Sequence, residues 1–122
     1  MKHLSTMVLC IFLLCAFGSI VYSQEIQVGT FTYGPSNEGY ALHKGSGERM
    51  STFEITFAKP FEVKPDVVIN INTLDAEKGI NVRFTVKAAS ISRDGFTIQV
   101  KTWADSQINL IGGAWIAVAQ KK

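Results

Sequence analysis

The residues best suited to bind a ligand are an arginine and a tryptophan on the outward-facing positions of two predicted strands. Arg83 belongs to the polar set of a strand over 82–88, and Trp103 continues the polar set of a strand over 96–101. An aromatic ring packs on the apolar C–H face of a pyranose, while arginine donors and a nearby carboxylate such as Asp105 bind hydroxyl groups. These residues therefore predict a sugar-binding surface, although Trp103 taken alone fits equally well as a cap on the core.

A catalytic constellation is hard to assemble from this sequence. His43 is the only histidine beyond the N-terminal leader, and a lone loop histidine is more often a solvated surface group than a general base. Gly112-Gly113 precedes a strand rather than a helix, so no phosphate-binding loop or nucleophile elbow is present. Asp75 and Glu77 flank a turn but lack the other ligands of a calcium loop. We expect no enzyme activity, no metal and no cofactor; the alternative is a hydrolase that uses His43.

The N-terminal segment has the features of a secretory signal peptide. Lys2 gives a positive start, an unbroken apolar run covers 7–17, and Val21-Tyr22-Ser23 offers small residues to a signal peptidase. We expect residues 1–23 to be cleaved and residues 24–122 to form one secreted, extracellular domain. The alternative is a retained membrane anchor, but the run is shorter than the roughly 20 apolar residues that a spanning helix needs.

Composition narrows the choice of partners. Both cysteines, Cys10 and Cys15, lie in the leader, so the rest of the chain must be held together by burial, alone or with subunit assembly. Beyond the leader the charge is near neutral, and Lys121-Lys122 is the only basic run. Nothing therefore favours nucleic acid or an anionic membrane as a partner, and we expect no membrane insertion after cleavage.

Hydrophobic alternation with a period of two dominates the sequence after the leader. Each alternating segment predicts a strand with one face in a core and one face toward water. Short strands at near-regular spacing, with no helix between them, predict a six-stranded antiparallel β-sandwich. The expected strands cover 26–33, 52–57, 67–72, 82–88, 96–101 and 114–119, with hairpin-type turns at 76–79 and 93–95 and a long loop over 34–49.

The last expected strand is apolar on both faces. Its side chains alternate between Trp115, Ala117 and Ala119 on one face and Ala114, Ile116 and Val118 on the other. Only one face of a strand in a sandwich meets the core, so the second face needs another cover. A loop over an interior strand is one explanation. A subunit interface is favoured, because it would also compensate for the missing disulfides.

Five motifs together give the sequence a resemblance to the H-type lectin family, the group of the snail agglutinins and the discoidin C-terminal domain. Each motif is weak alone, but their order and spacing over residues 53–118 are specific. The motifs are FAKPF at 57–61, KPDVVININTLD at 64–75, NVRFTVKA at 81–88, DGFTIQVKTWADS at 94–106 and AWIAVA at 114–119.

The resemblance implies a trimeric six-stranded sandwich, sometimes stacked into a hexamer, that binds N-acetylgalactosamine or galactose in clefts between protomers. Arg83 and Trp103 match the family's sugar-contacting arginine and tryptophan. Ala104 stands where the family commonly has a histidine, which puts the sugar preference in question. The remaining contacts are implied to come from the loop before the second strand, where Ser46 and Glu48 are the candidates.

The resulting expectation is a secreted lectin that recognises glycans on glycoproteins or cell surfaces. Asp105 and a loop group such as Glu48 of an adjacent protomer would accept hydrogen bonds from sugar hydroxyls. Three or six sites on one assembly would serve cell adhesion, agglutination or microbe recognition through multivalency. The alternative is a secreted structural or adhesion module that keeps the fold but has lost sugar binding, and Ala104 is the residue that favours it.

Overall fold

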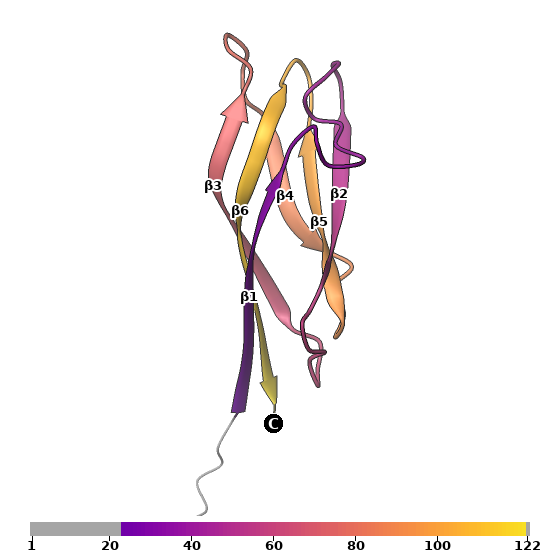
Figure 1. Ribbon diagram of the computed structural model, residues 1–122, viewed down its shortest axis with the longest axis vertical. Helices are drawn as coiled ribbons and strands as arrows, with labels where there is room; N and C mark the ends of the chain where they lie inside the picture. The colour runs from indigo at the N-terminus through magenta and orange to yellow at the C-terminus, as the bar shows by residue number, and fades with distance from the viewer. Residues whose placement is uncertain (1–22, 122) are drawn as a thin grey trace, which may run out of the picture.

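The computed structural model describes residues 23–121, and these form six strands in two three-stranded antiparallel sheets (Figure 1). The predicted six-stranded sandwich is confirmed. The predicted signal peptide lies outside the described residues except for Ser23, which opens the first strand. No helix in the described part of the chain is long and apolar enough to cross a membrane. The strands are β1 (Ser23–Tyr33), β2 (Arg49–Thr56), β3 (Asp66–Ala76), β4 (Phe84–Ala89), β5 (Gly95–Thr102) and β6 (Ile108–Lys121).

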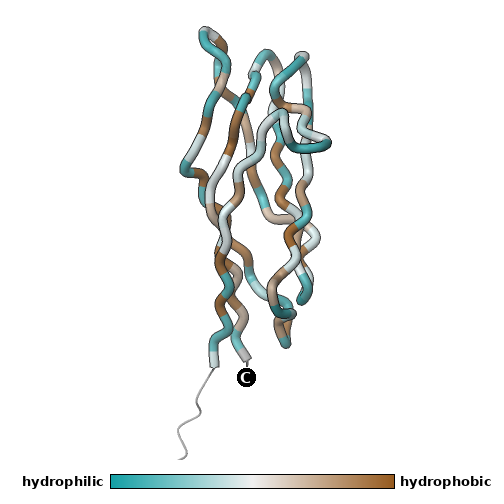
Figure 2. The backbone as a smooth tube through the Cα atoms, viewed as in Figure 1, coloured by the Kyte–Doolittle hydropathy of each residue, from teal (hydrophilic) through white to brown (hydrophobic). Residues whose placement is uncertain are grey.

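The two sheets have the strand orders β1-β6-β3 and β2-β5-β4, so β6 and β5 are the central strands. Apolar and polar residues alternate along the strands, as Figure 2 shows. On β5 the side chains of Phe96, Ile98 and Val100 are buried, and on β6 Trp115 packs edge-on against Phe96 across the core. The alternation in the sequence therefore marks the inward face of β5 correctly, whereas on β6, which is apolar on both faces, the structure shows that Trp115, Ala117 and Ala119 are the buried set.

The expected hairpin at 76–79 is wrong. β3 pairs with β6 while β4 pairs with β5, so the chain between β3 and β4 passes from one sheet to the other. Val82, expected on the inward face of the fourth strand, lies in this connection and is 44% exposed. The segment between β4 and β5 does join two paired antiparallel strands, so the turn expected at 93–95 is confirmed as a hairpin connection.

β6 begins earlier than expected, and Gly112 and Gly113 lie inside it. Glycine is needed at position 113 because the neighbouring strand approaches closely there. The carbonyl of Asn70 on β3 occupies the space that a Cβ on Gly113 would need. The side chain of Asn70 also accepts a hydrogen bond of 2.9 Å from the N–H of Ala114. Glycine here permits tight strand pairing beside a register shift in β3.

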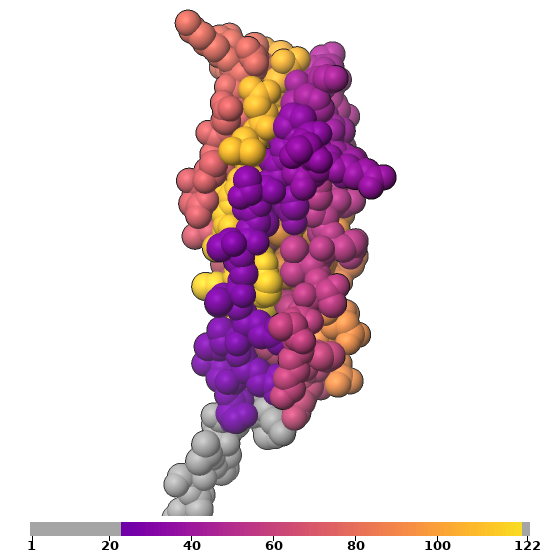
Figure 3. Space-filling view, viewed as in Figure 1, coloured from indigo at the N-terminus to yellow at the C-terminus, as the bar shows by residue number. Residues whose placement is uncertain are grey.

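The outer face of the β1-β6-β3 sheet carries an apolar row. Val28 on β1, Ile116 on β6 and Val68 on β3 are direct cross-strand partners, and they are 68%, 46% and 64% exposed. Figure 3 shows the three strands side by side along one side of the molecule. The explanation that a loop covers this face is therefore wrong for the described chain.

Three connections meet at one end of the sandwich, the upper end in Figure 1: 34–48, 77–83 and 103–107. The longest of them is folded onto the core. The Tyr40 hydroxyl donates a 2.6 Å hydrogen bond to the carbonyl of Ile108, and the N–H of Ile108 donates to the carbonyl of the fully buried Leu42. This end of the sandwich holds the polar residues singled out above.

Candidate functional site

Trp103 is the first residue after β5 and begins a tight turn. The N–H of Ser106 donates to the carbonyl of Trp103 over 3.3 Å and closes the turn. Thr102, one residue earlier, is fully buried, whereas Trp103 is 36% exposed and does not belong to the core cluster. Trp103 therefore keeps accessible surface at the end of the sandwich, as its position on the outward set of the strand predicts.

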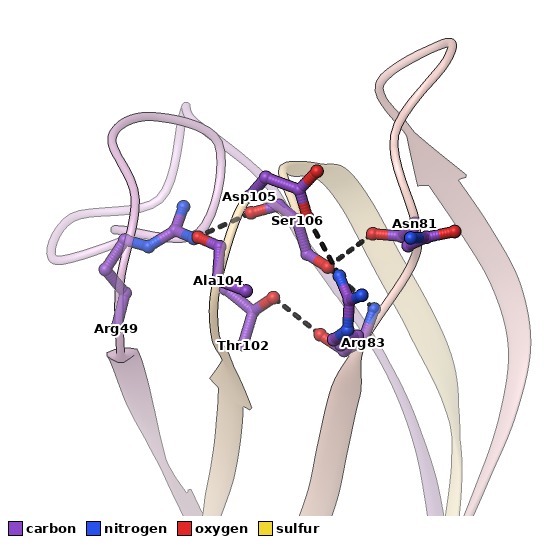
Figure 4. A network of polar contacts seen from close by, with 7 residues as sticks. All are labelled: Arg49, Asn81, Arg83, Thr102, Ala104, Asp105 and Ser106. Atoms are coloured by element: carbon purple, nitrogen blue, oxygen red, sulfur yellow. Dashed lines mark hydrogen bonds and ion pairs between the residues drawn. The ribbon is translucent and has the colours of Figure 1, made fainter.

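Arg83 and Asp105 form an ion pair beside this turn. The distance from Nη1 of Arg83 to Oδ1 of Asp105 is 2.8 Å, and the side chains are 36% and 58% exposed. Arg83 immediately precedes β4 rather than lying within it, contrary to the expected strand. Its guanidinium therefore reaches the turn that carries Trp103 (Figure 4).

Two buried hydroxyl groups hold the backbone of Arg83 in place. The Arg83 N–H donates to Oγ of Ser106 over 2.8 Å, and Oγ1 of Thr102 donates to the Arg83 carbonyl over 2.6 Å. Ser106 Oγ also donates to the carbonyl of Asn81 (Figure 4). This one hydroxyl therefore joins the 103–107 connection to the 77–83 connection. Because both hydroxyl residues have no exposed surface, the base of the Arg83 side chain is rigidly positioned.

Arg49, the first residue of β2, joins the long loop to the Trp103 turn. Its guanidinium donates to the carbonyls of Lys44 (2.8 Å) and Gly47 (3.0 Å) in the loop, and of Ala104 (3.2 Å) and Ser106 (2.7 Å) in the turn. The planar fork of arginine suits several carbonyls at fixed angles, which a lysine ammonium does not match. The two loops are thus held as one unit (Figure 4).

Ala104 adopts a left-handed backbone conformation, with φ of 57°. This region is unfavourable for a residue with a Cβ, and residues held there cluster at functional sites. The carbonyl of Ala104 accepts hydrogen bonds from Arg49 and from the N–H of Gly47, the latter over 2.9 Å. The turn is therefore fixed by the loop beside it.

The structure places the two loop candidates differently. Glu48 approaches Lys101 on β5, with 3.9 Å between Oε2 and Nζ, and Ser46 is exposed between Gly45 and Gly47, which both have positive φ. Arg83, Trp103, Ala104 and Asp105 gather at one turn. Ser46 and Glu48 lie in the loop that Arg49 ties to that turn.

His43 does not join this group. Its ring stacks on Tyr40 with 5.6 Å between ring centroids, and its Nδ1 is buried without a hydrogen-bond partner among the described residues. Within residues 23–121, no three His, Cys, Asp or Glu side chains are arranged to hold a metal ion. The site offers an aromatic face, paired charges and backbone carbonyls, which suit the recognition of a polar ring.

Residues 52–118, more than half of the chain, match the H-type lectin domain. The chain belongs to the H-type lectin domain family. The match includes Arg83, Trp103, Ala104 and Asp105, and it begins after the loop that carries Ser46 and Glu48. The resemblance noted in the sequence is thereby confirmed, and with it membership of a carbohydrate-binding family.

Comparisons with individual proteins agree with the family match. A Fuscovulum blasticum protein named "ATP synthase subunits region ORF 7" is 31% identical over 81 residues, which are 66% of this chain and 70% of that protein. Two structures of discoidin II from Dictyostelium discoideum superpose with a TM-score of 0.72 at 23% identity. They cover 82% and 81% of this chain, which spans 38% of the length of discoidin II. The discoidin likeness establishes the shared fold.

The sequence analysis missed three residues that hold the candidate site in place: Arg49, Thr102 and Ser106. Thr102 carried a signal, because it is a polar residue on the inward set of β5 after Phe96, Ile98 and Val100. Arg49 carried none. Its partners in the turn are more than 50 residues away in the chain, and no local pattern brings them together.

Proposed function

We propose that this H-type lectin domain is a secreted, non-catalytic lectin that binds a terminal N-acetylgalactosamine or galactose. The observation that carries the proposal is that Trp103, which is 36% exposed, lies on the same turn as Asp105, which is ion-paired with Arg83. An aromatic platform beside a paired donor and acceptor is an arrangement that suits a pyranose. The sugar binds reversibly, and no bond is made or broken.

The polar partners retain bonding capacity for a ligand. The guanidinium of Arg83 has five N–H donors, and the carboxylate of Asp105 has two acceptor oxygens, of which the ion pair uses one on each side. Sugar hydroxyls both donate and accept, so adjacent hydroxyls can bridge the pair. Because the two charges compensate each other, this position favours a neutral sugar.

Assembly completes the proposed site. The apolar row of Val28, Ile116 and Val68 is the surface through which we propose that copies of the chain associate into a trimer or a hexamer, since exposed apolar patches commonly mark interfaces. Ser46 and Glu48 of an adjacent copy then add acceptors beside Trp103. Several weak sites on one frame raise the avidity for a glycosylated surface by about 10²- to 10⁴-fold, which suits adhesion, agglutination or microbe recognition.

A second candidate is a secreted structural or adhesion module that has lost sugar binding. Ala104 favours it, because a methyl group stands where the family commonly has a hydrogen-bonding histidine. The same assembly without any glycan signal is the result expected for this candidate.

A glycan array tests the first candidate against the second. The wild-type protein should bind arrays bearing terminal N-acetylgalactosamine or galactose, and Trp103→Ala should lose more than nine-tenths of that signal because the stacking platform is gone. Val63→Ala is the matched control, since Val63 is an exposed apolar residue in the connection between β2 and β3, at the other end of the sandwich. Equal signals from wild type and Trp103→Ala would contradict the proposed site.

Secretion is tested separately by expressing the full chain in eukaryotic cells. The protein should accumulate in the medium with Gln24 as its first residue. Retention in the cell membrane with residues 1–23 still attached would contradict the proposed localisation.

A further inference from the structure

A second polar feature lies on the outer face of the β2-β5-β4 sheet, beside the Trp103 turn. It is a groove of about 340 Å³, here called the sheet groove. Its side chains occupy outward positions, because the intervening residues Ser51 on β2 and Val100 and Thr102 on β5 are buried. The lining residues are Glu48, Met50, Thr85, Lys87, Gln99 and Lys101.

The sheet groove lies next to the proposed sugar site in the strand register. Lys101 on β5 is opposite Met50 on β2 and Thr85 on β4, and Trp103 and Arg83 are two positions farther along the chain, just beyond the ends of β5 and β4. Two positions along a strand span about 7 Å. This step is comparable with the length of one sugar unit, so the groove is within reach of the second unit of a disaccharide whose terminal unit lies on Trp103.

The charges of the groove differ from those of the terminal site. Lys87 and Lys101 face Glu48 alone, which leaves an excess of positive charge. The Lys101–Glu48 pair is long, at 3.9 Å, with side chains 40% and 72% exposed, and such pairs hold their partners weakly. Lys87 forms no ion pair within residues 23–121. Two ammonium groups are therefore available to an anion.

The other lining groups suit a sugar ring. Gln99 offers both donors and an acceptor through its amide, and Thr85 offers a hydroxyl. Met50 is 51% exposed and provides an apolar contact surface. The groove thus combines the polar groups that hold ring hydroxyls with cations that favour a negatively charged substituent.

We propose that the sheet groove binds the second unit of a glycan and selects a unit that carries a carboxylate or a sulfate. The inference rests on the proposed function, because the neutral terminal unit must first occupy the Trp103 site. Lys87 and Lys101 donate to the anionic group, while Gln99 and Thr85 contact the ring. The preferred ligand is then an acidic glycan with a neutral terminal sugar.

Calorimetric titration of the secreted protein with two disaccharides tests this directly. One is N-acetylgalactosamine linked to glucuronic acid, and the other is N-acetylgalactosamine linked in the same way to glucose. At low ionic strength the acidic disaccharide should bind about fivefold more tightly, the upper range for exposed ion pairs. The preference should shrink as salt is added, because salt screens exposed charges. A third disaccharide, with a sulfated second unit, allows the affinities for the carboxylate and the sulfate to be compared.

The double variant Lys87→Gln/Lys101→Gln should lose the preference and keep its affinity for the neutral disaccharide. Lys59→Gln/Lys64→Gln is the matched control, since it removes the same charge from the connection between β2 and β3 and should keep the preference.

Equal affinity of the wild type for the two disaccharides would overturn this inference and leave the proposed function standing. Absence of binding to either disaccharide would overturn both. A double variant with altered assembly in sedimentation and an unchanged preference would show that the groove contacts another copy of the chain, which would also overturn the inference.

Discussion

Arg83 and Asp105 form an ion pair in this site, and both side chains are partly exposed to solvent. Exposed ion pairs contribute about 0–1 kcal/mol to folding, so the pair is not needed to keep the sandwich folded. The buried hydroxyls of Thr102 and Ser106 already fix the backbone of Arg83. The charge of Asp105 is therefore available to orient the guanidinium toward a ligand.

Asp105→Asn should separate binding from stability. The change keeps the shape of the side chain but removes the charge that attracts Nη1 of Arg83. We expect the dissociation constant for N-acetylgalactosamine to rise about fivefold, while the free energy of unfolding changes by less than about 1 kcal/mol. Calorimetric titration and urea denaturation measure the two quantities. Unchanged affinity would show that the ion pair takes no part in binding.

At the scale of structural elements, the site depends on two loops that the chain separates and the fold brings together. Arg49 bonds carbonyls in the long loop and in the Trp103 turn, and Tyr40 anchors the same loop to β6. Neither side chain needs to touch a sugar to affect binding. Both act by positioning the elements that carry Trp103 and Asp105.

Arg49→Lys should lower both stability and affinity, because an ammonium cannot reach four carbonyls in fixed directions. We expect a loss of about 1 kcal/mol in the free energy of unfolding and a several-fold weaker affinity for galactose. Arg93→Lys is the control, since Nε of Arg93 donates to the carbonyl of Phe61 over 2.8 Å at the opposite end of the sandwich. It should lower stability without changing affinity. If both variants weakened binding equally, a positioning role for Arg49 would be excluded.

Alkaline pH should weaken the anchoring of the long loop. Burial raises the pKa of Tyr40 from its ordinary value of 10.0 to about 12, so the folded state keeps the phenol proton that the unfolded state releases first. The stabilisation is fully present below pH 10 and is lost as the pH rises through 12.

Tyr40→Phe checks this by measurement of the free energy of unfolding against pH. The variant should be less stable than wild type by about 1 kcal/mol at neutral pH, and this difference should narrow above pH 10. Tyr33→Phe is the comparison, because burial raises the pKa of Tyr33 as well but only Tyr40 bonds Ile108. Parallel curves for wild type and Tyr40→Phe across this range would refute the account.

At the scale of the whole molecule, the two outer sheet faces differ in character. The β1-β6-β3 sheet presents the apolar row, and the β2-β5-β4 sheet presents the polar sheet groove. Ile116 is exposed on the central strand of its sheet, which gives the molecule a surface suited to association. The described residues contain no cysteine, so association would take the place of disulfides as a source of stability. The polar face remains suited to a ligand.

Ile116→Asp should disrupt the proposed trimer or hexamer. Ile116 is 46% exposed in the single chain, so a carboxylate there does not disturb the core but is costly in a dry interface. We expect sedimentation to give a folded monomer and agglutination to fall by about 10²-fold or more. Val63→Asp, at an exposed apolar residue outside both sheets, should keep the assembly. A monomeric wild-type protein would contradict the prediction at once.

The sequence by itself determined the local features of this protein. Period-two alternation is a property of neighbouring residues, so it marked the four strands β2 to β5 and the inward face of β5. The same parity predicted that Trp103 faces outward, and the spaced motifs predicted the family. These features depend on residue type and short spacing, which are fully present in the chain.

Only the tertiary structure decided which strands share a sheet and which loops share a site. The segment at 76–79 reads locally as a hairpin, yet long-range pairing sends β3 and β4 to different sheets. The sequence predicted that Gly113 precedes the last strand, yet it lies within β6, where the lack of a Cβ allows the backbone of Asn70 to approach closely. Arg49 meets the Trp103 turn across more than 50 residues of chain. Such contacts arise from packing and register between distant segments, and no periodicity in the sequence encodes them.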